Sequence, residues 1–180
     1  MNIRRGVRAD WPAVVEIYNH AVEEGLKTAD TEPISLESRA QWFLQHEDLR
    51  HPIFVAEREG LVLGFCSLSP HRPGRRALRK VAEVSYYVHR DQRGAGVGCA
   101  LLTHAVERAH EYGFVHLFAL LLDVNQQSIR MLERAGFYKW GHLPEVADFD
   151  GVVCGQVIYG RQLPGAPSSC ASNGTVPVAT

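Results

Sequence analysis

The chain has 180 residues and is 46% hydrophobic, which is enough for one domain with a buried core. Its formal net charge of −1 gives no overall field to attract nucleic acid or an anionic membrane, and its longest apolar run, Leu117–Leu122, is too short to span a bilayer. The four cysteines are widely spaced, the nine histidines are scattered and residues 1–10 are polar, so we expect a cytoplasmic protein with no disulfide framework, no metal site and no signal peptide.

Hydrophobic periodicity predicts alternating strands and helices. The first half should contain a strand at Ile3–Val7, a helix from Trp11 capped by Asp10, a helix capped by Ser35, and strands at Ile53–Ala56 and Leu61–Leu68 joined at Glu59-Gly60. The second half should contain a strand at Val84–Val88, a helix from Cys99 capped by Gly113, a buried strand in Phe114–Leu122, a helix at Asn125–Ala135, and strands at Phe137–Leu143 and Val152–Tyr159. This order predicts an α/β fold with a central mixed β-sheet flanked by helices. Residues 164–180 show no periodicity and are expected to form a disordered tail behind a domain of residues 1–163.

A glycine-rich turn lies between the Val84–Val88 strand and the helix that follows. Its glycines allow positive φ and close approach of a ligand, and the first N–H groups of the next helix are unpaired, so the turn predicts a cradle for a phosphate or pyrophosphate. Arg93 adds a full positive charge. A Walker loop would need Lys before Ser or Thr, and a dinucleotide fingerprint would need a glycine at position 99; Cys99 and Ala100 rule out both.

The run Gln92-Arg93-Gly94-Ala95-Gly96-Val97-Gly98 resembles the pyrophosphate loop, Q/R-x-x-G-x-G/A, of the GNAT acetyltransferases. Asn125-Gln126-Gln127-Ser128, followed by a helix that ends in Gly136-Phe137, resembles that family's N-x-x-A/S block, and the order of elements is that of the GNAT fold. The resemblance implies acetyl-coenzyme A as co-substrate and no metal. The cofactor-binding residues that it implies are Tyr87, Val88, Gln92, Arg93, Gly94, Ala95, Gly96, Val97, Gly98, Asn125 and Ser128.

Further segments are similar to the branch of phosphinothricin acetyltransferases and of L-amino-acid N-acyltransferases that act on methionine sulfone and sulfoximine: Tyr18-Asn19-His20, Thr31-Glu32-Pro33 and Ala82-Glu83. This likeness implies a homodimer, a small-molecule amine acceptor and Glu83 as the catalytic base. A carboxylate in a partly dry cleft can have its pKa raised and then accept the proton of an ammonium group. The alternative is that Glu83 is only an exposed acid at a strand start. The substrate-binding residues expected are Arg72, Arg79 and Tyr86; the alternative for the arginines is a solvated basic loop.

The chain departs from that branch at three places. Ala29 stands where the branch has an aromatic residue, and Val153 and Gly155 stand where it has Trp and Asp, so the usual acceptor pocket is altered. Leu132 stands where a His or Tyr can act as general acid. Two rivals to a small-molecule acetyltransferase therefore stay open: a non-catalytic acyl-CoA-binding sensor, and a GNAT enzyme that acts on peptide, protein or polyamine amines.

Overall fold

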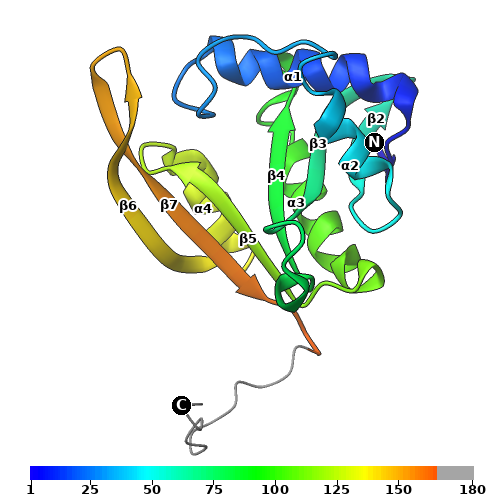
Figure 1. Ribbon diagram of the computed structural model, residues 1–180. Coiled ribbons are helices and arrows are strands. Elements are labelled where there is room, and N and C mark those ends of the chain that lie inside the picture. The colour runs from blue at the N-terminus through cyan, green and yellow to red at the C-terminus, as the bar shows by residue number, and fades with distance from the viewer. Residues whose placement is uncertain (166–180) are drawn as a thin grey trace, which may run out of the picture.

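The computed structural model describes residues 1–165, and the strands and helices follow the predicted order (Figure 1). The elements are β1 (Asn2–Arg5), α1 (Trp11–Glu23), α2 (Ala40–Glu47), β2 (Ile53–Arg58), β3 (Leu61–Pro70), β4 (Val81–Val88), α3 (Val97–Arg108), β5 (His116–Leu122), α4 (Gln126–Arg134), β6 (Tyr138–Phe149) and β7 (Val152–Gln162). Short 3-10 turns lie at Arg8–Asp10, Arg76–Leu78, Arg90–Gln92 and Ala109–Tyr112. The predicted α/β class, a mixed sheet flanked by helices, is confirmed.

Within residues 1–165, seven strands form one sheet in the order β1-β2-β3-β4-β5-β7-β6. Neighbouring strands are antiparallel except β4 and β5, which run parallel. These two strands pair only over Val81–Glu83 and His116–Phe118, and beyond that point they diverge, so that the sheet opens (Figure 1). Glu83 is therefore the last residue of β4 that pairs with β5.

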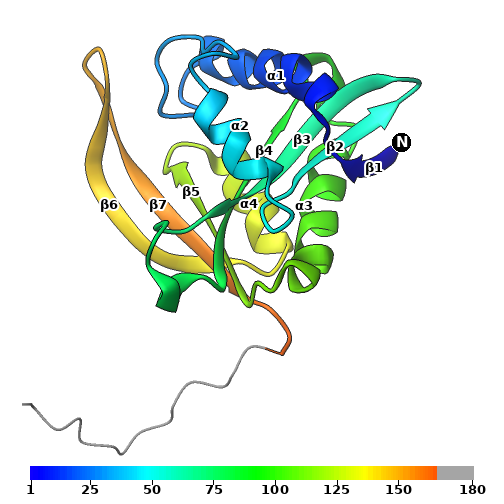
Figure 2. The ribbon, with the colours of Figure 1, turned by 45° about the vertical axis from the view of Figure 1, so that its right-hand side comes forward.

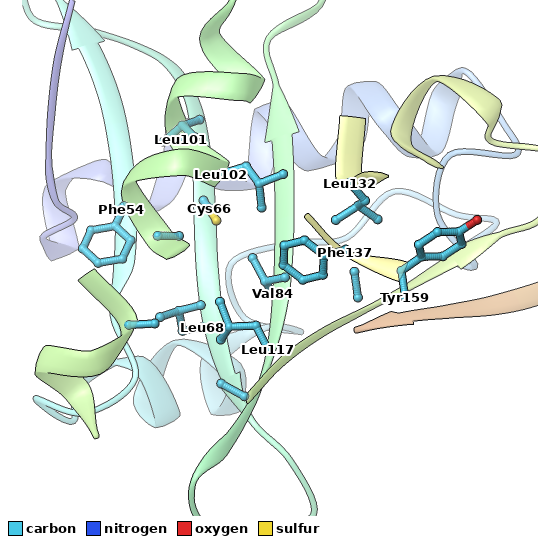
Figure 3. Packing of buried hydrophobic residues seen from close by; sticks show 14 of the residues in the cluster. Phe54, Cys66, Leu68, Val84, Leu101, Leu102, Leu117, Leu132, Phe137 and Tyr159 are labelled. Atoms are coloured by element: carbon cyan, nitrogen blue, oxygen red, sulfur yellow. The ribbon is translucent and has the colours of Figure 1, made fainter. Parts of the chain in front are cut away.

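The two faces of the sheet carry different helices (Figure 2). Each face also has its own hydrophobic cluster. On one face, α3 and α4 bury Leu101, Leu102 and Leu132 against Val84 and Leu117 (Figure 3). On the other face, α1 and α2 pack on the sheet, and their cluster includes Trp11, Ile17, Phe43, Val55 and Phe65. Burial of this apolar area, at about 25 cal/mol per Å², holds the helices on the sheet.

Side chains along β4 alternate between these two faces because successive strand residues point in opposite directions. Val84 joins the cluster under α3 and α4, whereas Glu83, Ser85 and Tyr87 line a cavity on the side of α1 and α2. One strand thus presents a polar row to one side of the opening and an apolar row to the other.

Several predicted boundaries move by a few residues, each for a local reason. The first strand ends at Arg5 rather than Val7, because the Asp10 carboxylate accepts hydrogen bonds from the Val7 N–H (2.8 Å) and from the Arg4 guanidinium and so folds the chain into a 3-10 turn. The same contacts occupy Asp10, so its side chain makes no capping hydrogen bond to α1.

The second helix begins later than the sequence predicts. It begins at Ala40, and Ser35 instead exchanges hydrogen bonds with Ser38 in a turn that precedes it. Of the apolar residues in this helix, Phe43 is buried, but Leu44 is 51% exposed. The apolar spacing of a short helix next to a loop therefore did not predict the residue at which the helix begins.

The hairpin turns and the last two strands, β6 and β7, agree better with the sequence prediction. Glu59-Gly60 and Asp150-Gly151 both have positive φ, as a two-residue hairpin turn requires. The last two strands extend further than their apolar runs, to Phe149 and Gln162, because their pairing continues through residues exposed to solvent. Residues 166–180, most of the expected tail, lie outside the described residues. No helix in the part of the chain that the structure describes combines the length and apolar character needed to cross a bilayer.

Candidate active site

The glycine-rich turn leads from β4 to the start of α3. Gly94 and Gly96 have φ of 77° and 78°, the left-handed region, and Gly96 is the N-cap residue of the helix. A Cβ atom added at either glycine would meet no atom within 4 Å, so both open onto free space. The Ala100 N–H bonds to the Gly96 carbonyl at 3.0 Å, which leaves the N–H groups of residues 97–99 without a helical partner. The turn can therefore receive an anion.

A cleft of about 380 Å³ runs along this turn. The residues expected to bind the cofactor line it, with the exception of Ala95: Tyr87, Val88, Gln92, Arg93, Gly94, Gly96, Val97, Gly98, Asn125 and Ser128. The start of α4, which follows β5 in the chain, thus meets the end of β4 and the start of α3 in one hollow.

The charge in the cleft differs from the sequence expectation in one respect. The Arg93 guanidinium forms an ion pair with the Glu24 carboxylate just after α1, and it also donates to the Val88 carbonyl at 3.4 Å. Glu24 was not predicted as part of the site, because only the fold brings residue 24 beside residue 93. Arg93 is thus held in place at the cleft, with part of its charge neutralised.

The start of α4 forms the opposite wall. Asn125 caps this helix, with its side-chain oxygen accepting the Ser128 N–H at 3.3 Å. The Tyr86 hydroxyl donates to the Ser128 carbonyl at 3.4 Å, and burial raises the pKa of this hydroxyl well above its ordinary value. Tyr86, expected at the acceptor, therefore lies in the cleft with the residues expected at the cofactor.

The backbone of β4 offers further donors where the sheet opens. The His89 N–H bonds to the Leu63 carbonyl of β3 at 2.9 Å, and in an antiparallel ladder alternate residues share this direction. The N–H groups of Tyr86 and Val88 therefore point the other way, toward the opening that β5 has left. Such donors can stabilise negative charge that develops on a carbonyl oxygen.

Glu83 lines a second hollow, a cavity of about 370 Å³ on the side of α1 and α2. Aromatic and hydroxyl side chains surround it there: Tyr18, Trp42, Phe43, Phe65, Tyr87, Ser67, Ser69 and Ser85. Burial raises the pKa of the half-buried Glu83 carboxyl above its ordinary value, and a hydrogen bond with Ser85 acts in the opposite direction. Tyr87 and Lys27 line both this cavity and the cleft, so the two hollows adjoin at the opening of the sheet.

Arg72 and Arg79, expected to bind the acceptor, line neither the Glu83 cavity nor the cleft at the glycine-rich turn. They line a separate basic hollow of about 490 Å³ that also includes Arg50, Arg75 and Arg76. The cationic side chains that line the Glu83 cavity are Lys27 and Arg39. Neither was predicted, because both belong to the loop and turn between α1 and α2, where no periodic signal exists.

Arg39 is held by a polar network at the cavity wall. It forms an ion pair with Asp30, donates to the Tyr18 hydroxyl at 3.3 Å and lies over the Tyr18 ring at 5.1 Å. The Tyr18 hydroxyl also contacts Thr28 at 2.6 Å. The loop after α1 is thereby fastened over the Glu83 cavity.

Comparison with known proteins decides the family. Residues 11–137 match the sequence model of the acetyltransferase (GNAT) family. The chain belongs to the GNAT family. This GNAT chain is 40% identical over 164 residues to a Bacillus subtilis (strain 168) protein named "Putative phosphinothricin acetyltransferase YwnH", and the match covers 91% of this chain and 99% of that protein.

Two solved GNAT-like structures are similar in fold. The ribosomal-protein-alanine N-acetyltransferase from Brucella melitensis has a TM-score of 0.84 and 35% identity, over 91% of this chain and all of that one (100%). A GNAT superfamily phosphinothricin acetyltransferase from Sinorhizobium meliloti, in complex with AcCoA, has a TM-score of 0.84 and 30% identity, over 90% of this chain and 88% of that one.

The structure shows what surrounds the departures from the phosphinothricin acetyltransferase branch at Leu132, Gly155 and Ala29. Leu132 is 1% exposed and belongs to the core, so this position cannot deliver a proton to the cleft. At Gly155, the space of a side chain is filled by Asp123 and His142, which lie 3.0 Å apart, and the Asp123 carboxylate accepts the Gly155 N–H at 3.0 Å. Ala29 lines the Glu83 cavity, where its small side chain leaves room for an acceptor.

Proposed function

We propose that this GNAT chain transfers the acetyl group of acetyl-coenzyme A to the amine of a small molecule, an amino acid or an amino-acid analogue of the phosphinothricin or methionine sulfone type. The observation that carries the proposal is Glu83: a half-buried carboxyl with a raised pKa, at the point where β4 and β5 separate, in the wall of a small cavity that adjoins the cleft. The relatives named for phosphinothricin support the acceptor class.

The cradle would hold the pyrophosphate of acetyl-coenzyme A. The unpaired N–H groups at residues 97–99 supply hydrogen bonds and the positive end of the helix dipole, and Arg93 supplies charge at the rim. The pantetheine arm would then lie between the open edge of β4 and the start of α4, where Tyr86, Asn125 and Ser128 line the cleft.

Glu83 would act as the general base. It accepts a proton from the ammonium group of the acceptor, directly or through water, so that the neutral nitrogen can form the new amide bond. The N–H groups of Tyr86 and Val88 face the opening and can stabilise the negative charge that develops on the thioester oxygen. The carbon–sulfur bond then breaks, and the thiolate takes a proton from water, so no side chain has to replace the acid that is missing at Leu132.

The acceptor cavity favours a small molecule with an apolar body and an anionic group. Its aromatic walls can pack on an apolar side chain, and Lys27, which makes no ion pair within 4.0 Å among the described residues, and Arg39 can meet a carboxylate. Because Arg72 and Arg79 line the separate basic hollow, we assign the carboxylate contact to Lys27 and Arg39.

We also infer that the protein is a cytoplasmic homodimer whose residues 1–163 form the catalytic domain. β6 is a 12-residue edge strand, and the surface it shares with β7 exposes Tyr138, Trp140, Leu143, Val146, Val152 and Val153. An exposed apolar edge of this length is normally covered, and a second copy of the chain would cover it. The free thiols of Cys66, Cys99 and Cys154 agree with a reducing compartment.

A thiol-release assay with acetyl-coenzyme A tests the function and the acceptor class together. The panel contains free amino acids, phosphinothricin, methionine sulfone, polyamines and peptides with free N-termini. We expect the highest kcat/KM with a free amino acid or analogue. Faster turnover of a peptide, in line with the ribosomal-protein relative, would overturn the acceptor class. Thiol release no faster than water hydrolysis with every acceptor would favour the sensor.

A further inference from the structure

We propose that Glu16, His20 and His89 form a binding site for a divalent transition-metal ion such as Zn²⁺. Glu16 and His20 are four residues apart on α1 and therefore lie on the same helical face. His89 directly follows β4 and begins the turn that leads to the glycine cradle. One ligand atom from each of the three side chains lies within 4.8 Å of the other two.

This distance is close to what a metal requires. Zn²⁺ binds His nitrogen and carboxylate oxygen at about 2.0–2.2 Å, which places the ligand atoms of a tetrahedral site about 3.4 Å apart. The ligand atoms, which lie within 4.8 Å of one another, would move closer by side-chain rotation when the metal binds. Two imidazoles and one carboxylate form a ligand set that zinc accepts, with a further position left for water.

The surroundings favour a cation. A hollow of about 670 Å³ is lined by these three residues together with Glu23, Arg90 and Asp91. Arg90 forms an ion pair with Glu23, so the carboxylates of Glu16 and Asp91 are left to balance a divalent charge. His20 is buried and Glu16 is exposed, so the site is anchored on one side and reached from solvent on the other.

The imidazole rings are held, but weakly. They pack edge to face with their centroids 4.5 Å apart. The Nδ1 atoms of His20 and His89 receive only long contacts from backbone N–H groups, of 3.4 Å from Arg90 and 3.2 Å from Asp91. If His89 binds metal through Nε2, its Nδ1 carries the proton and gives up the contact with the Asp91 N–H; the Asp91 carboxylate, 3.8 Å from Nδ1, can then accept that proton in a hydrogen bond.

The site is separate from the proposed chemistry. Glu16, His20 and His89 line neither the coenzyme cleft nor the Glu83 cavity. A bound metal would instead tie α1 to the residue that precedes the cradle turn. Loss of the metal should therefore leave acetyl-coenzyme A binding in place, which separates this proposal from the proposed function.

Isothermal titration of the untagged full chain with Zn²⁺ tests the site. We expect one Zn²⁺ per chain, bound about tenfold or more weakly by Glu16→Gln and by His89→Gln, since removal of even a supporting group commonly costs tenfold. Glu107→Gln is the matched control, because it removes an exposed carboxylate from another histidine-bearing helix, α3. It should bind as the wild type does.

Visible absorption of Co²⁺ in place of Zn²⁺ gives a second measurement. The wild type should show the d–d bands of a cobalt ion held by protein ligands, and Glu16→Gln should lose them. Acetyl-coenzyme A affinity, measured on each variant, shows that the cradle is intact. Absence of saturable Zn²⁺ binding by the wild type, or wild-type affinity for Zn²⁺ in both Glu16→Gln and His89→Gln, would overturn the proposal.

Discussion

Replacement of Gly96 by Val tests the glycine cradle most directly. Gly96 has φ of 78°, and a Cβ at this position would meet no protein atom within 4 Å. A valine would therefore fit the protein but project its branches into the space where the anion should lie. Forcing a side chain into the left-handed region costs about 1–2 kcal/mol, which a domain of ordinary stability survives.

The expected loss of affinity follows from the hydrogen bonds that the anion would make there. A hydrogen bond to a charged group contributes about 1.5–3 kcal/mol, so the loss of one or two bonds to the N–H groups at residues 97–99 amounts to about 3 kcal/mol. That corresponds to roughly a hundredfold rise in the dissociation constant of acetyl-coenzyme A. Titration calorimetry on the folded variant measures it.

Gly60 provides the matched control. It also has positive φ, 80°, and open space at its Cβ, but it lies in the hairpin between β2 and β3, away from the cleft. Gly60→Val should lose similar stability and keep the wild-type affinity. Unchanged affinity in a folded Gly96→Val protein, or equal losses in both variants, would refute the cradle.

Further predictions concern the base, the core and the assembly. Glu83→Gln should raise the free energy of unfolding at about pH 7, because burial raises the pKa of this carboxyl and its charged form therefore destabilises the native state. The gain should vanish below the ordinary carboxyl pKa of about 4.3, where the native and unfolded states are both protonated. Urea unfolding at the two pH values measures the change. Ser85→Ala should move the ascending limb of the kcat/KM pH profile to higher pH, because the Ser85 hydrogen bond lowers the pKa of Glu83; a shift to lower pH would be inconsistent with that contact. Leu132→Ala should destabilise the fold by about 2–5 kcal/mol in urea unfolding, as a core leucine does, and a negligible change would mean that this residue is not core. Trp140→Glu should yield monomers in light scattering. Leu49→Glu, at a residue that is 82% exposed and outside the sheet, should leave the dimer intact. A monomeric wild-type protein would contradict the proposed dimer.

The features that could be predicted from the sequence depend on local rules. Glycines at positions 94 and 96 adopt the positive φ that a turn of this kind needs, and the apolar spacing of Leu101 and Leu102 marks a buried helix face. The order of strands and helices follows from such local signals, but the strand predicted at Val84–Val88 begins at Val81 in the structure, so that Glu83 lies within it.

The walls of the acceptor cavity could not be predicted in this way. Arg39 and Lys27 reach the Glu83 cavity only because the loop after α1 folds back over the sheet, fastened by Asp30 and Tyr18. Arg72 looked equally suitable in the sequence, yet it lies in a different hollow. Contacts between residues distant in sequence depend on packing, which no short motif records.

The role of Glu83 is the central claim, and a pH–rate profile of wild type and Glu83→Gln with the best acceptor tests it. The glutamine keeps the size of the side chain but cannot accept the proton, so kcat/KM should fall by on the order of a hundredfold at neutral pH. The loss should shrink as pH rises, because more of the amine is then already neutral. Acetyl-coenzyme A affinity should hardly change, since Glu83 does not line the coenzyme cleft. Parallel profiles of equal height would remove Glu83 from the reaction and contradict the proposed mechanism.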